Sequence, residues 1–496
     1  MTDHVDVLII GAGLSGIGAA AHLTRELPRT SYVVLEAREV SGGTWDLFRY
    51  PGVRSDSDMF TMGYRFRPWR HEEALGSGER ILEYLRDTAR EYDVERRIRY
   101  SHRVIRVSWD SDTSLWTVEA DHHGEAVTYT AGLVWSCRGY YDYERGHEPE
   151  FAGAEEFAGE IVHPQHWPDD LDWTGRDVVV IGSGATAVTL VPAMAEDAAH
   201  VTMLQRSPSY ILSLPRRDPF AVRARRWLPA GLAHRVVRWK SILVTAVFYR
   251  LSRRRPETVR RMVRKQNVAL LPEGYDVETH FTPRYDPWDQ RMCFVPNADL
   301  FTSLRSGDAE VVTSTIERFD ADGVVLTGGR HLHADVIVTA TGLTLSPFGG
   351  IELEVDGEKV DPASLMTYRA LMLGGVPNFV FTIGYTNASW TLKVGLVCEY
   401  LVRLLEHMGR HGYAVVEPRL PEGGMATRPL LDFGAGYVRR ALDRLPKQGP
   451  RVPWVTSTAY GDDVRLLRRG PVADRHLVFT ARAPRAPVAA EAAAGR

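Results

Sequence analysis

The sequence contains few cysteines, and those that it has are far apart. Cys137, Cys293 and Cys398 are widely spaced and odd in number, and none belongs to a C-x-x-C pair. This spacing excludes a disulfide framework and a metal site of the C-x-x-C type. It also excludes a redox-active cysteine pair, and so few cysteines are typical of a protein of the reducing cytoplasm.

The N-terminus lacks a long hydrophobic run, and the whole sequence lacks a strong charge of either sign. The apolar residues 5–10 form a run too short for a signal-peptide core or a membrane span, so they are predicted to form a buried strand. A net charge of -3 argues against a general nucleic-acid-binding protein. The 496 residues, of which 44% are hydrophobic and 25% charged, indicate a soluble globular protein with two or more domains.

A dinucleotide-binding motif follows the first strand. Gly11, Gly13 and Gly16 lead into a helix predicted over 17–27, and a second apolar strand ends at Glu36. In this βαβ pattern the first glycine permits a tight turn, the second lets the backbone approach a pyrophosphate, and the third lets the helix pack on the strand. The acid, 25 residues after the first glycine, can bind the diol of a ribose. The pattern predicts an FAD site here.

The same pattern recurs in the middle of the chain, but its second strand ends differently. Gly182 and Gly184 form the turn, and the position that matches Glu36 is Gln205, followed by Arg206. An acid would repel a 2′-phosphate, whereas a guanidinium can bind one. The motif therefore predicts NADPH rather than NADH, although a strand-end arginine can also be a solvated surface charge. The predicted NADPH contacts are Gly182, Gly184, Thr186, Ala187, Arg206 and Ser207.

The loop after the first motif is rich in aromatic and charged residues. Residues 42–56 begin with a glycine pair that includes Gly43, continue through Trp45 and a Pro-Gly turn at 51–52, and end at Asp56. Such a confined loop is suited to lying along a flavin. A surface loop whose Trp45 covers part of the core would have the same composition.

The segment between the two motifs is the most specific functional signal in the chain. Residues 157–168 read FAGEIVHPQHWP and resemble F-x-G-x-x-x-H-x-x-x-W-P, the fingerprint of the type I Baeyer-Villiger monooxygenases. Residues 42–56 resemble another motif of that family, G-G-x-W-x-x-x-R-[YF]-P-G-x-x-x-D. Long runs closely resemble the ethionamide-activating monooxygenase subgroup of mycobacteria, up to about residue 470. The residues that match the fingerprint are Phe157, Gly159, His163, Trp167 and Pro168.

The resemblance implies an FAD-containing enzyme that uses NADPH and dioxygen. Such an enzyme converts ketones to esters or lactones through a C4a-peroxyflavin, and the subgroup implies S-oxygenation of sulfides or thioamides as a companion activity. A flavin peroxide is an anion, so its site needs a fixed cation. The family pattern implies that Arg291 is this cation and that Asp56 orients it. The chain departs from the pattern at Gln290, where many members have lysine, and at Arg138, where a small or hydroxyl residue is usual.

His163 lies in the fingerprint and has two candidate roles. It can act as a catalytic acid or base, or its ring can hydrogen-bond across the hinge between the two nucleotide-binding units. The second role would couple NADPH binding to domain movement. We favour the second role, because the residue lies in the linker between the two motifs.

The C-terminal third supplies a further part of the predicted flavin site. Residues 384–393 place small polar residues around Trp390. This composition suits the wall of a flavin and substrate pocket, although a core tryptophan with a polar cap would look the same. The predicted FAD contacts are Gly11, Gly13, Gly16, Glu36, Gly43, Trp45, Asp56, Val104 and Trp390.

Together the motifs predict an α/β fold with two dinucleotide-binding, Rossmann-like domains. The chain is expected to cross between them at 137–139 and at 340–342, and the strand-rich segments before the first crossing are expected to form a small antiparallel sheet. The expected divisions are 1–145 and 343–480 for the FAD domain, 146–342 for the NADPH domain, about 211–290 for a helical insertion in the latter, and 481–496 for a disordered tail.

Residues 211–265 differ in composition from the rest of the chain. They contain sixteen Lys or Arg and only two acidic residues, and Val236, Trp239, Leu243 and Val247 recur at helical spacing. A basic amphipathic arm of this kind can rest on an anionic membrane. The alternative is a helical insertion packed on the NADPH domain, which we favour because apolar stripes usually face a core.

The expected partners are dioxygen and a small-molecule ketone or sulfur compound. One rival interpretation is a flavin-containing monooxygenase restricted to nitrogen and sulfur, which Asp56 and the Trp167-Pro168 pair argue against. Another is a non-catalytic, redox-responsive protein that keeps FAD as a structural ligand. Formation of an oxygenated product separates the enzymes from the binding protein, and ketone oxidation separates the two enzymes.

Overall fold

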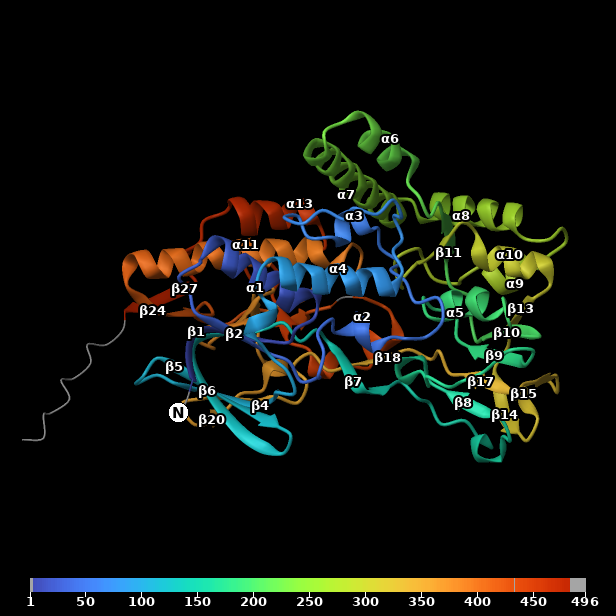
Figure 1. Ribbon diagram of the computed structural model, residues 1–496, viewed down its shortest axis with the longest axis horizontal. Coiled ribbons are helices and arrows are strands. Elements are labelled where there is room, and N and C mark those ends of the chain that lie inside the picture. Colours follow the sequence, from blue (N-terminus) through green and yellow to red (C-terminus); the bar gives the residue numbers. More distant parts are fainter. Residues whose placement is uncertain (1–2, 432, 482–496) are drawn as a thin grey trace, which may run out of the picture.

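Two sheets, one built around each dinucleotide motif, form the framework of the protein (Figure 1). The computed structural model describes residues 3–431 and 433–481. In both sheets the strands that carry the glycine turns lie in the middle and pair in parallel with their neighbours. The predicted α/β fold with two Rossmann-like units is confirmed.

The first sheet joins the N-terminal motif to the C-terminal part of the chain. β1 pairs in parallel with β2 and β6, and β6 pairs in parallel with β23. Val7, Leu8 and Ile9 of β1 are fully buried, as expected for a strand covered on both faces. The main strands are β1 (Asp3–Ile10), β2 (Tyr32–Leu35), β3 (Ile98–Arg99), β4 (Arg103–Asp110), β5 (Leu115–His122), β6 (Glu125–Ser136), β19 (Glu352–Val355), β20 (Glu358–Lys359), β21 (Thr367–Tyr368), β22 (Met372–Leu373) and β23 (Phe379–Phe381).

The antiparallel sheet expected from the strand-rich segments is present, and it is part of the first sheet. β4, β5 and β6 pair in antiparallel fashion and extend the first sheet. The length of β6 is the reason, because residues 125–131 pair with β5 while residues 129–136 pair with β1.

The second sheet is parallel throughout and contains the second motif. Its order is β13-β10-β9-β17-β8, and helix α5 follows the glycine turn after β9. Its strands are β8 (Glu160–Val162), β9 (Asp177–Ile181), β10 (His200–Gln205), β13 (Ala309–Thr313) and β17 (Val336–Val338). Helices α5 (Ala187–Met194) and α10 (Asp299–Ser306) pack against each other beside it.

Two connections link the sheets, close to the predicted crossings. β7 (Tyr141–Gly146) follows the first crossing and pairs in antiparallel fashion with β18 (Leu343–Leu345), which follows the second. The amide of His147 also donates to the carbonyl oxygen of Gly342 at 2.9 Å. The two crossings therefore lie side by side, in a connecting region that we call the hinge.

The helical insertion lies between β11 (Ile211–Leu214) and β12 (Cys293–Pro296), which pair with each other. Only part of it packs as expected. α8 packs on β11, whereas α7 packs on α3, a helix of the N-terminal part, so that α6 and α7 project from the body (Figure 1). The expectation that the apolar stripe faces a core is wrong for Trp239, Leu243 and Val247, which are exposed. The insertion contains α6 (Pro219–Trp227), α7 (Ala230–Arg254), α8 (Pro256–Leu270) and α9 (Val277–Phe281).

The largest core cluster packs α1, α4 and α11 against the first sheet.

Within the described part of the chain, no helix is both long and apolar enough to cross a bilayer. Ala481 ends β27, and the rest of the predicted tail, residues 482–496, lies outside the described residues. The other helices are α1 (Leu14–Glu26), α2 (Thr44–Leu47), α3 (Met59–Met62), α4 (Gly78–Glu91), α11 (Trp390–His411), α12 (Gly436–Arg439) and α13 (Tyr460–Asp463), and the other strands are β14 (Ile316–Asp320), β15 (Gly323–Leu326), β16 (His331–His333), β24 (Tyr413–Pro418), β25 (Arg428–Pro429), β26 (Lys447–Gln448) and β27 (Leu477–Ala481).

Candidate functional site

An open cavity of about 1290 Å³ lies where the two glycine turns and the C-terminal segment meet. Most of the predicted site residues line it, although they come from distant parts of the sequence. Gly16, Ala187 and His163 do not line it. The predicted residues that do are Gly11, Gly13, Glu36, Gly43, Trp45, Asp56, Val104, Gly182, Gly184, Thr186, Arg206, Ser207, Arg291 and Trp390.

The first glycine turn is closely packed against its own helix. Gly11 has a φ of +98°, and a Cβ on Gly16 would lie 1.8 Å from the carbonyl oxygen of Gly11. A side chain at Gly16 would therefore push α1 away from the turn. Since no other residue type lacks a Cβ, this packing supports the helix-to-strand role predicted for Gly16.

Glu36 directly follows β2 and lies beside this turn. Its carboxylate accepts hydrogen bonds from the backbone amides of Ala12, at 2.6 Å, and Arg38, at 3.0 Å. Burial raises the pKa of Glu36, and the two amide hydrogen bonds oppose that rise. The carboxylate is thus fixed at the rim of the cavity, where a ribose diol could exchange for the Ala12 amide as its partner.

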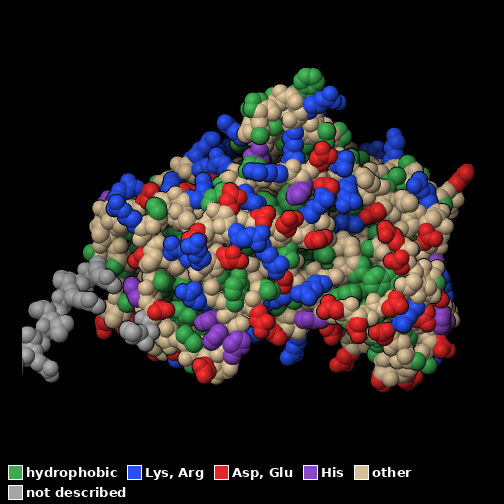
Figure 2. Space-filling view, in the orientation of Figure 1, with side chains coloured by type: hydrophobic (Ala, Val, Ile, Leu, Met, Phe, Trp, Pro, Cys, Tyr) green, Lys and Arg blue, Asp and Glu red, His purple; other side chains and the backbone are tan. Residues whose placement is uncertain are grey.

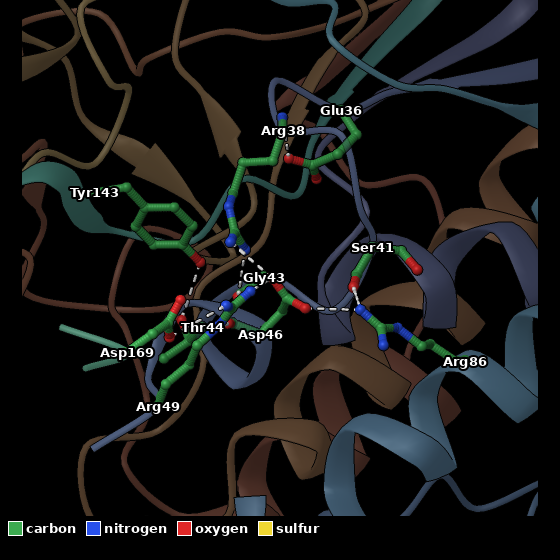
Figure 3. Close-up of polar contacts among 10 residues, drawn as sticks. All are labelled: Glu36, Arg38, Ser41, Gly43, Thr44, Asp46, Arg49, Arg86, Tyr143 and Asp169. Atoms are coloured by element: carbon green, nitrogen blue, oxygen red, sulfur yellow. Dashed lines mark hydrogen bonds and ion pairs between the residues drawn. The ribbon is translucent and has the colours of Figure 1, made fainter. Parts of the chain in front are cut away.

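Ion pairs to one buried carboxylate, that of Asp46, fix the loop that follows, which contains α2 (Figure 3). Asp46 is only 5% exposed and lies between two arginines, Arg38 from the end of β2 at 2.6 Å and Arg86 from α4 at 2.7 Å. Tyr143 from β7 bonds Thr44 at 3.0 Å. These contacts hold Gly43 and Trp45 against the cavity, and the motif alone does not predict them, because the partners come from separate segments.

The C-terminal segment lies against the first glycine turn through Trp390, which was predicted from the sequence to be part of the wall of a flavin pocket. The Nε1 of Trp390, the first residue of α11, donates to Oγ of Ser15 at 3.0 Å. Its ring centroid lies 4.9 Å from that of Tyr140, another residue of the cavity wall. Trp390 thus joins α11 to the start of α1.

Asp56 and Arg291, which both line the cavity, form a bidentate ion pair. Nε and Nη2 of Arg291 donate to the two carboxylate oxygens of Asp56 at 2.7 and 2.8 Å. The negative charge of Asp56 raises the pKa of Arg291, against the opposing effect of burial. About a third of the Arg291 side chain, 34%, remains exposed in the open cavity. The pair therefore presents a permanent, oriented positive charge to any molecule bound there.

The second glycine turn is more open. A Cβ on Gly182 would lie 2.4 Å from the carbonyl oxygen of Ala340, but a Cβ on Gly184 would meet no described atom within 4 Å. Gln205 points away from the turn and donates to the carbonyl of His280 at 2.8 Å. Arg206 is exposed at the rim of the cavity, so its guanidinium is free to reach a phosphate group.

His163 lies at the hinge rather than in the cavity. Its Nδ1 accepts from the amide of Gln165 at 3.2 Å, and its Nε2 lies 3.3 Å from the carbonyl oxygen of Gly342. Burial lowers the pKa of His163, which favours the neutral ring with its proton on Nε2. A Cβ on Gly146 would lie 2.1 Å from the ring, so the imidazole is packed between both crossings. This geometry supports a structural role.

Sequence reasoning gave Arg138 no role, yet it also joins the two crossings. Its guanidinium donates to the carbonyl of Ser346 at 2.7 Å and lies over Gly349, where a Cβ would be 1.7 Å away. The glycine pair at 349–350 is the only local signal of this contact. Arg138 also lines the cavity.

The chain resembles flavin-dependent proteins over nearly its whole length. A family profile described as flavin-binding monooxygenase-like matches residues 74–368, and one described as an NAD(P)-binding Rossmann-like domain matches residues 9–68. The FAD-containing monooxygenase EthA of Mycobacterium tuberculosis is 52% identical over 97% of this chain and 99% of that protein. EthA of Mycolicibacterium smegmatis is 50% identical over 97% of this chain and 98% of that protein.

Solved structures with low sequence identity share the fold. A steroid monooxygenase bound to NADP aligns with a TM-score of 0.75 and 22% identity, over 96% of this chain and all of that one. An open structure of cyclohexanone monooxygenase aligns with a TM-score of 0.74 and 21% identity, over 97% and 100% of the two chains. At this identity the likeness concerns the fold alone.

Proposed function

The chain belongs to the family of flavin-binding monooxygenases, and from this premise we propose that it is an FAD-containing, NADPH-dependent enzyme that converts ketones to esters or lactones. The resemblance to flavin monooxygenases that residues 157–168 indicated is thereby confirmed. Ketone oxidation is the more specific part of this proposal, beyond membership of the family. The observation that supports it is the ion pair between Arg291 and Asp56 in the cavity.

The residues that line the cavity suit FAD and NADPH in their chemistry. FAD would lie along the first turn, held by the backbone of Gly11 and Gly13 and by the carboxylate of Glu36, with Trp45 and Trp390 as walls. NADPH would be held by the backbone of the second turn and by Arg206 and Ser207, which we infer to bind the 2′-phosphate. Bound FAD would accept electrons from NADPH and pass them to dioxygen. The proposed FAD-site and NADPH-site residues are those named above from the sequence.

The work of the protein side chains is electrostatic. Attack on a ketone turns the carbonyl oxygen into an anion, and a fixed positive charge beside it lowers the barrier. Arg291 supplies that charge, and Asp56 sets the direction of the guanidinium through two hydrogen bonds. Loss of one such donor costs about 3 kcal/mol, or on the order of a hundredfold in rate.

A second candidate activity is S-oxygenation of sulfides or thioamides. It is supported by the 52% identity to a monooxygenase of the subgroup that the sequence resembles. Sulfur attack creates no carbonyl anion, so this activity depends less on Arg291. The two activities can therefore be separated in one protein by changing this residue.

The test measures products from a linear ketone, a cyclic ketone and a thioether while NADPH and oxygen consumption are followed. We expect ester or lactone from the wild type. In Arg291→Ala this product should fall about a hundredfold while NADPH oxidation continues and releases hydrogen peroxide. Arg305→Ala, which changes an exposed arginine on α10, is the matched control.

Each alternative predicts a different result. Sulfoxide from the thioether together with only uncoupled oxidation of both ketones would favour the monooxygenase restricted to nitrogen and sulfur. If neither a sulfoxide nor an ester or lactone forms, the result would favour the non-catalytic FAD-binding protein. Undiminished ester formation in Arg291→Ala would remove the role proposed for the ion pair.

A further inference from the structure

The outer side of α6 and α7 exposes an unusual number of large hydrophobic side chains. Sixteen such side chains are exposed in the described part of the chain, and nine of them lie between residues 220 and 251. Trp227, Leu243 and Trp239 are 74%, 62% and 59% exposed. Contiguous apolar surface of this kind usually marks an interaction site. We call the nine side chains the hairpin face: Phe220, Val222, Trp227, Leu232, Trp239, Leu243, Val244, Val247 and Leu251.

The same hairpin is strongly basic. Residues 219–254 contain nine Lys or Arg and no Asp or Glu, although the whole protein has a net charge of -3. Figure 2 shows hydrophobic and basic side chains together on the part that projects from the body. Such a local charge selects a negative partner. The exposed arginines among the nine are Arg223, Arg226, Arg235, Arg250, Arg253 and Arg254.

The inner side of the hairpin is firmly attached, so the hairpin face cannot fold onto the body. Arg238 of α7 donates to the carbonyls of Phe60 and Gly63, each at 2.8 Å, and Arg225 of α6 donates to the carbonyl of Trp69 at 2.6 Å. Lys240 pairs with Asp218, which caps α6. The buried apolar residues of the two helices are Ala221, Ala224, Ala233, Val237 and Ile242.

We propose that the hairpin face docks the protein on an anionic membrane surface. Tryptophan prefers the boundary between headgroups and acyl chains, and arginines beside it pair with lipid phosphates. α7 places Leu232, Trp239, Leu243 and Val247 on one side at intervals of four or seven residues. The hairpin would therefore lie in the interface plane rather than across the bilayer. A second copy of the chain fits less well, because a symmetric contact would oppose two basic faces.

Docking would bring the bilayer close to the cavity wall. Ile242, on the inner side of α7, packs against Tyr385, which lines the cavity. α3, to which Arg238 is bonded, begins three residues after Asp56. Lipophilic substrates would thus be drawn from the membrane beside the reaction site.

The test is sedimentation of the FAD-loaded full chain with lipid vesicles. We expect binding to vesicles that contain phosphatidylglycerol, at least tenfold weaker binding to pure phosphatidylcholine, and loss of binding in 1 M salt. The variant Trp227→Ser/Trp239→Ser/Leu243→Ser should bind at least tenfold more weakly. Arg223→Glu/Arg226→Glu should lose the preference for phosphatidylglycerol. Vesicle binding needs no turnover, so it is measured independently of the proposed reaction.

Matched controls change similar side chains elsewhere. Ile105→Ser/Leu420→Ser removes side chains that are 43% and 44% exposed, and Arg29→Glu/Arg305→Glu reverses two exposed arginines. Both should bind as the wild type does, and all variants should keep their FAD content and thermal midpoint. Absence of wild-type binding, or equal binding by the hairpin variants, would overturn the proposal. So would a solution dimer that the tryptophan variant dissociates, because the face would then belong to a second copy.

Discussion

The two glycine turns share one sequence pattern, yet the protein closes the first and leaves the second open. At the first turn, a Cβ on Gly13 would lie 3.5 Å from Gly43, and a Cβ on Gly16 would lie 1.8 Å from the oxygen of Gly11. At the second turn, a Cβ on Gly184 would meet no described atom within 4 Å. The contact of Gly16 lies within the turn itself, whereas the difference between Gly13 and Gly184 comes from the segment that covers the first turn at Gly43.

The side chains at the strand ends differ in the same way. Glu36 is 6% exposed and bound by two backbone amides, whereas Arg206 is exposed. The glycine pair at 42–43 and the C-terminal Trp390 lie against the first turn. A closed site suits a cofactor that stays bound through many turnovers, and an open site suits one that enters and leaves. The comparison therefore predicts that FAD, at the first turn, is the resident cofactor and that NADPH, at the second turn, exchanges.

The largest expected effect comes from filling the space at the first turn. Gly16→Ala adds only a Cβ, but this atom would overlap the oxygen of Gly11, so α1 must shift. We expect the purified protein to retain less than a tenth of the wild-type FAD, as measured by the ratio of flavin to protein absorbance. Gly409→Ala is the control, because it adds the same atom within α11 where no described atom lies within 4 Å. Full flavin content in Gly16→Ala would show that the first turn is no tighter than the second.

The next largest effect tests the open strand end. Arg206→Ala removes a charged donor that we assign to the 2′-phosphate, which contributes about 2 kcal/mol, or roughly thirtyfold in affinity. The Michaelis constant for NADPH should rise by about that factor, and that for NADH should change less than twofold. Arg305→Ala should change neither. Equal effects on the two cofactors would make Arg206 a surface charge, the alternative that the sequence leaves open.

The order of strands and helices could be predicted from the sequence because each element depends on the pattern of residues within its own short segment. The apolar run VDVLII before Gly11 predicts both the strand and its burial, and the apolar run before Gly182 does the same. The pairing of Asp56 with Arg291 was available only through family resemblance, since 235 residues separate them. Nothing in the composition of either segment requires that they meet.

What could not be predicted depends on partners that are distant in the sequence. The basic helix was expected to bury its stripe, because that is the usual outcome. Instead, Arg225 of α6 and Arg238 of α7 attach the helical hairpin to the body by its other side. Helical periodicity identifies the stripe without showing what faces it. Likewise, Arg138 departs from the family pattern, and only the structure shows Gly349 beneath its guanidinium.

A moderate effect is expected at the hinge between the two sites. His163→Ala removes the link between the crossings, and we expect flavin reduction by NADPH to slow about tenfold, with more uncoupled peroxide. Oxygenation of substrate after full flavin reduction should continue in a single turnover, which stopped-flow measurement separates from reduction. His163→Gln, which keeps a donor, should recover part of the rate. Loss of oxygenation in the pre-reduced enzyme would instead make His163 a catalytic acid or base.

The same residue gives a pH dependence with a defined sign. Burial lowers the pKa of His163 below its usual 6.5, so below that pH the unfolded chain binds a proton that the folded chain excludes. Its contribution to stability is therefore present above pH 6.5 and is lost as the pH falls toward the folded pKa. The drop in thermal midpoint between pH 7 and pH 5 should be smaller in His163→Gln than in the wild type. An unchanged drop would show that other groups cause it.

The smallest effect is expected at the second turn, where the added atom meets empty space. Gly184→Ala places a Cβ with no described neighbour within 4 Å, so the thermal midpoint and the FAD content should stay at wild-type values. The Michaelis constant for NADPH should rise only about threefold, because a pyrophosphate approaching the backbone must pass the new methyl group. The same one-atom change would then remove the cofactor at one turn and merely hinder it at the other. If Gly184→Ala also lost FAD, both turns would belong to one packed unit, and the division into a resident and an exchanging cofactor would fail.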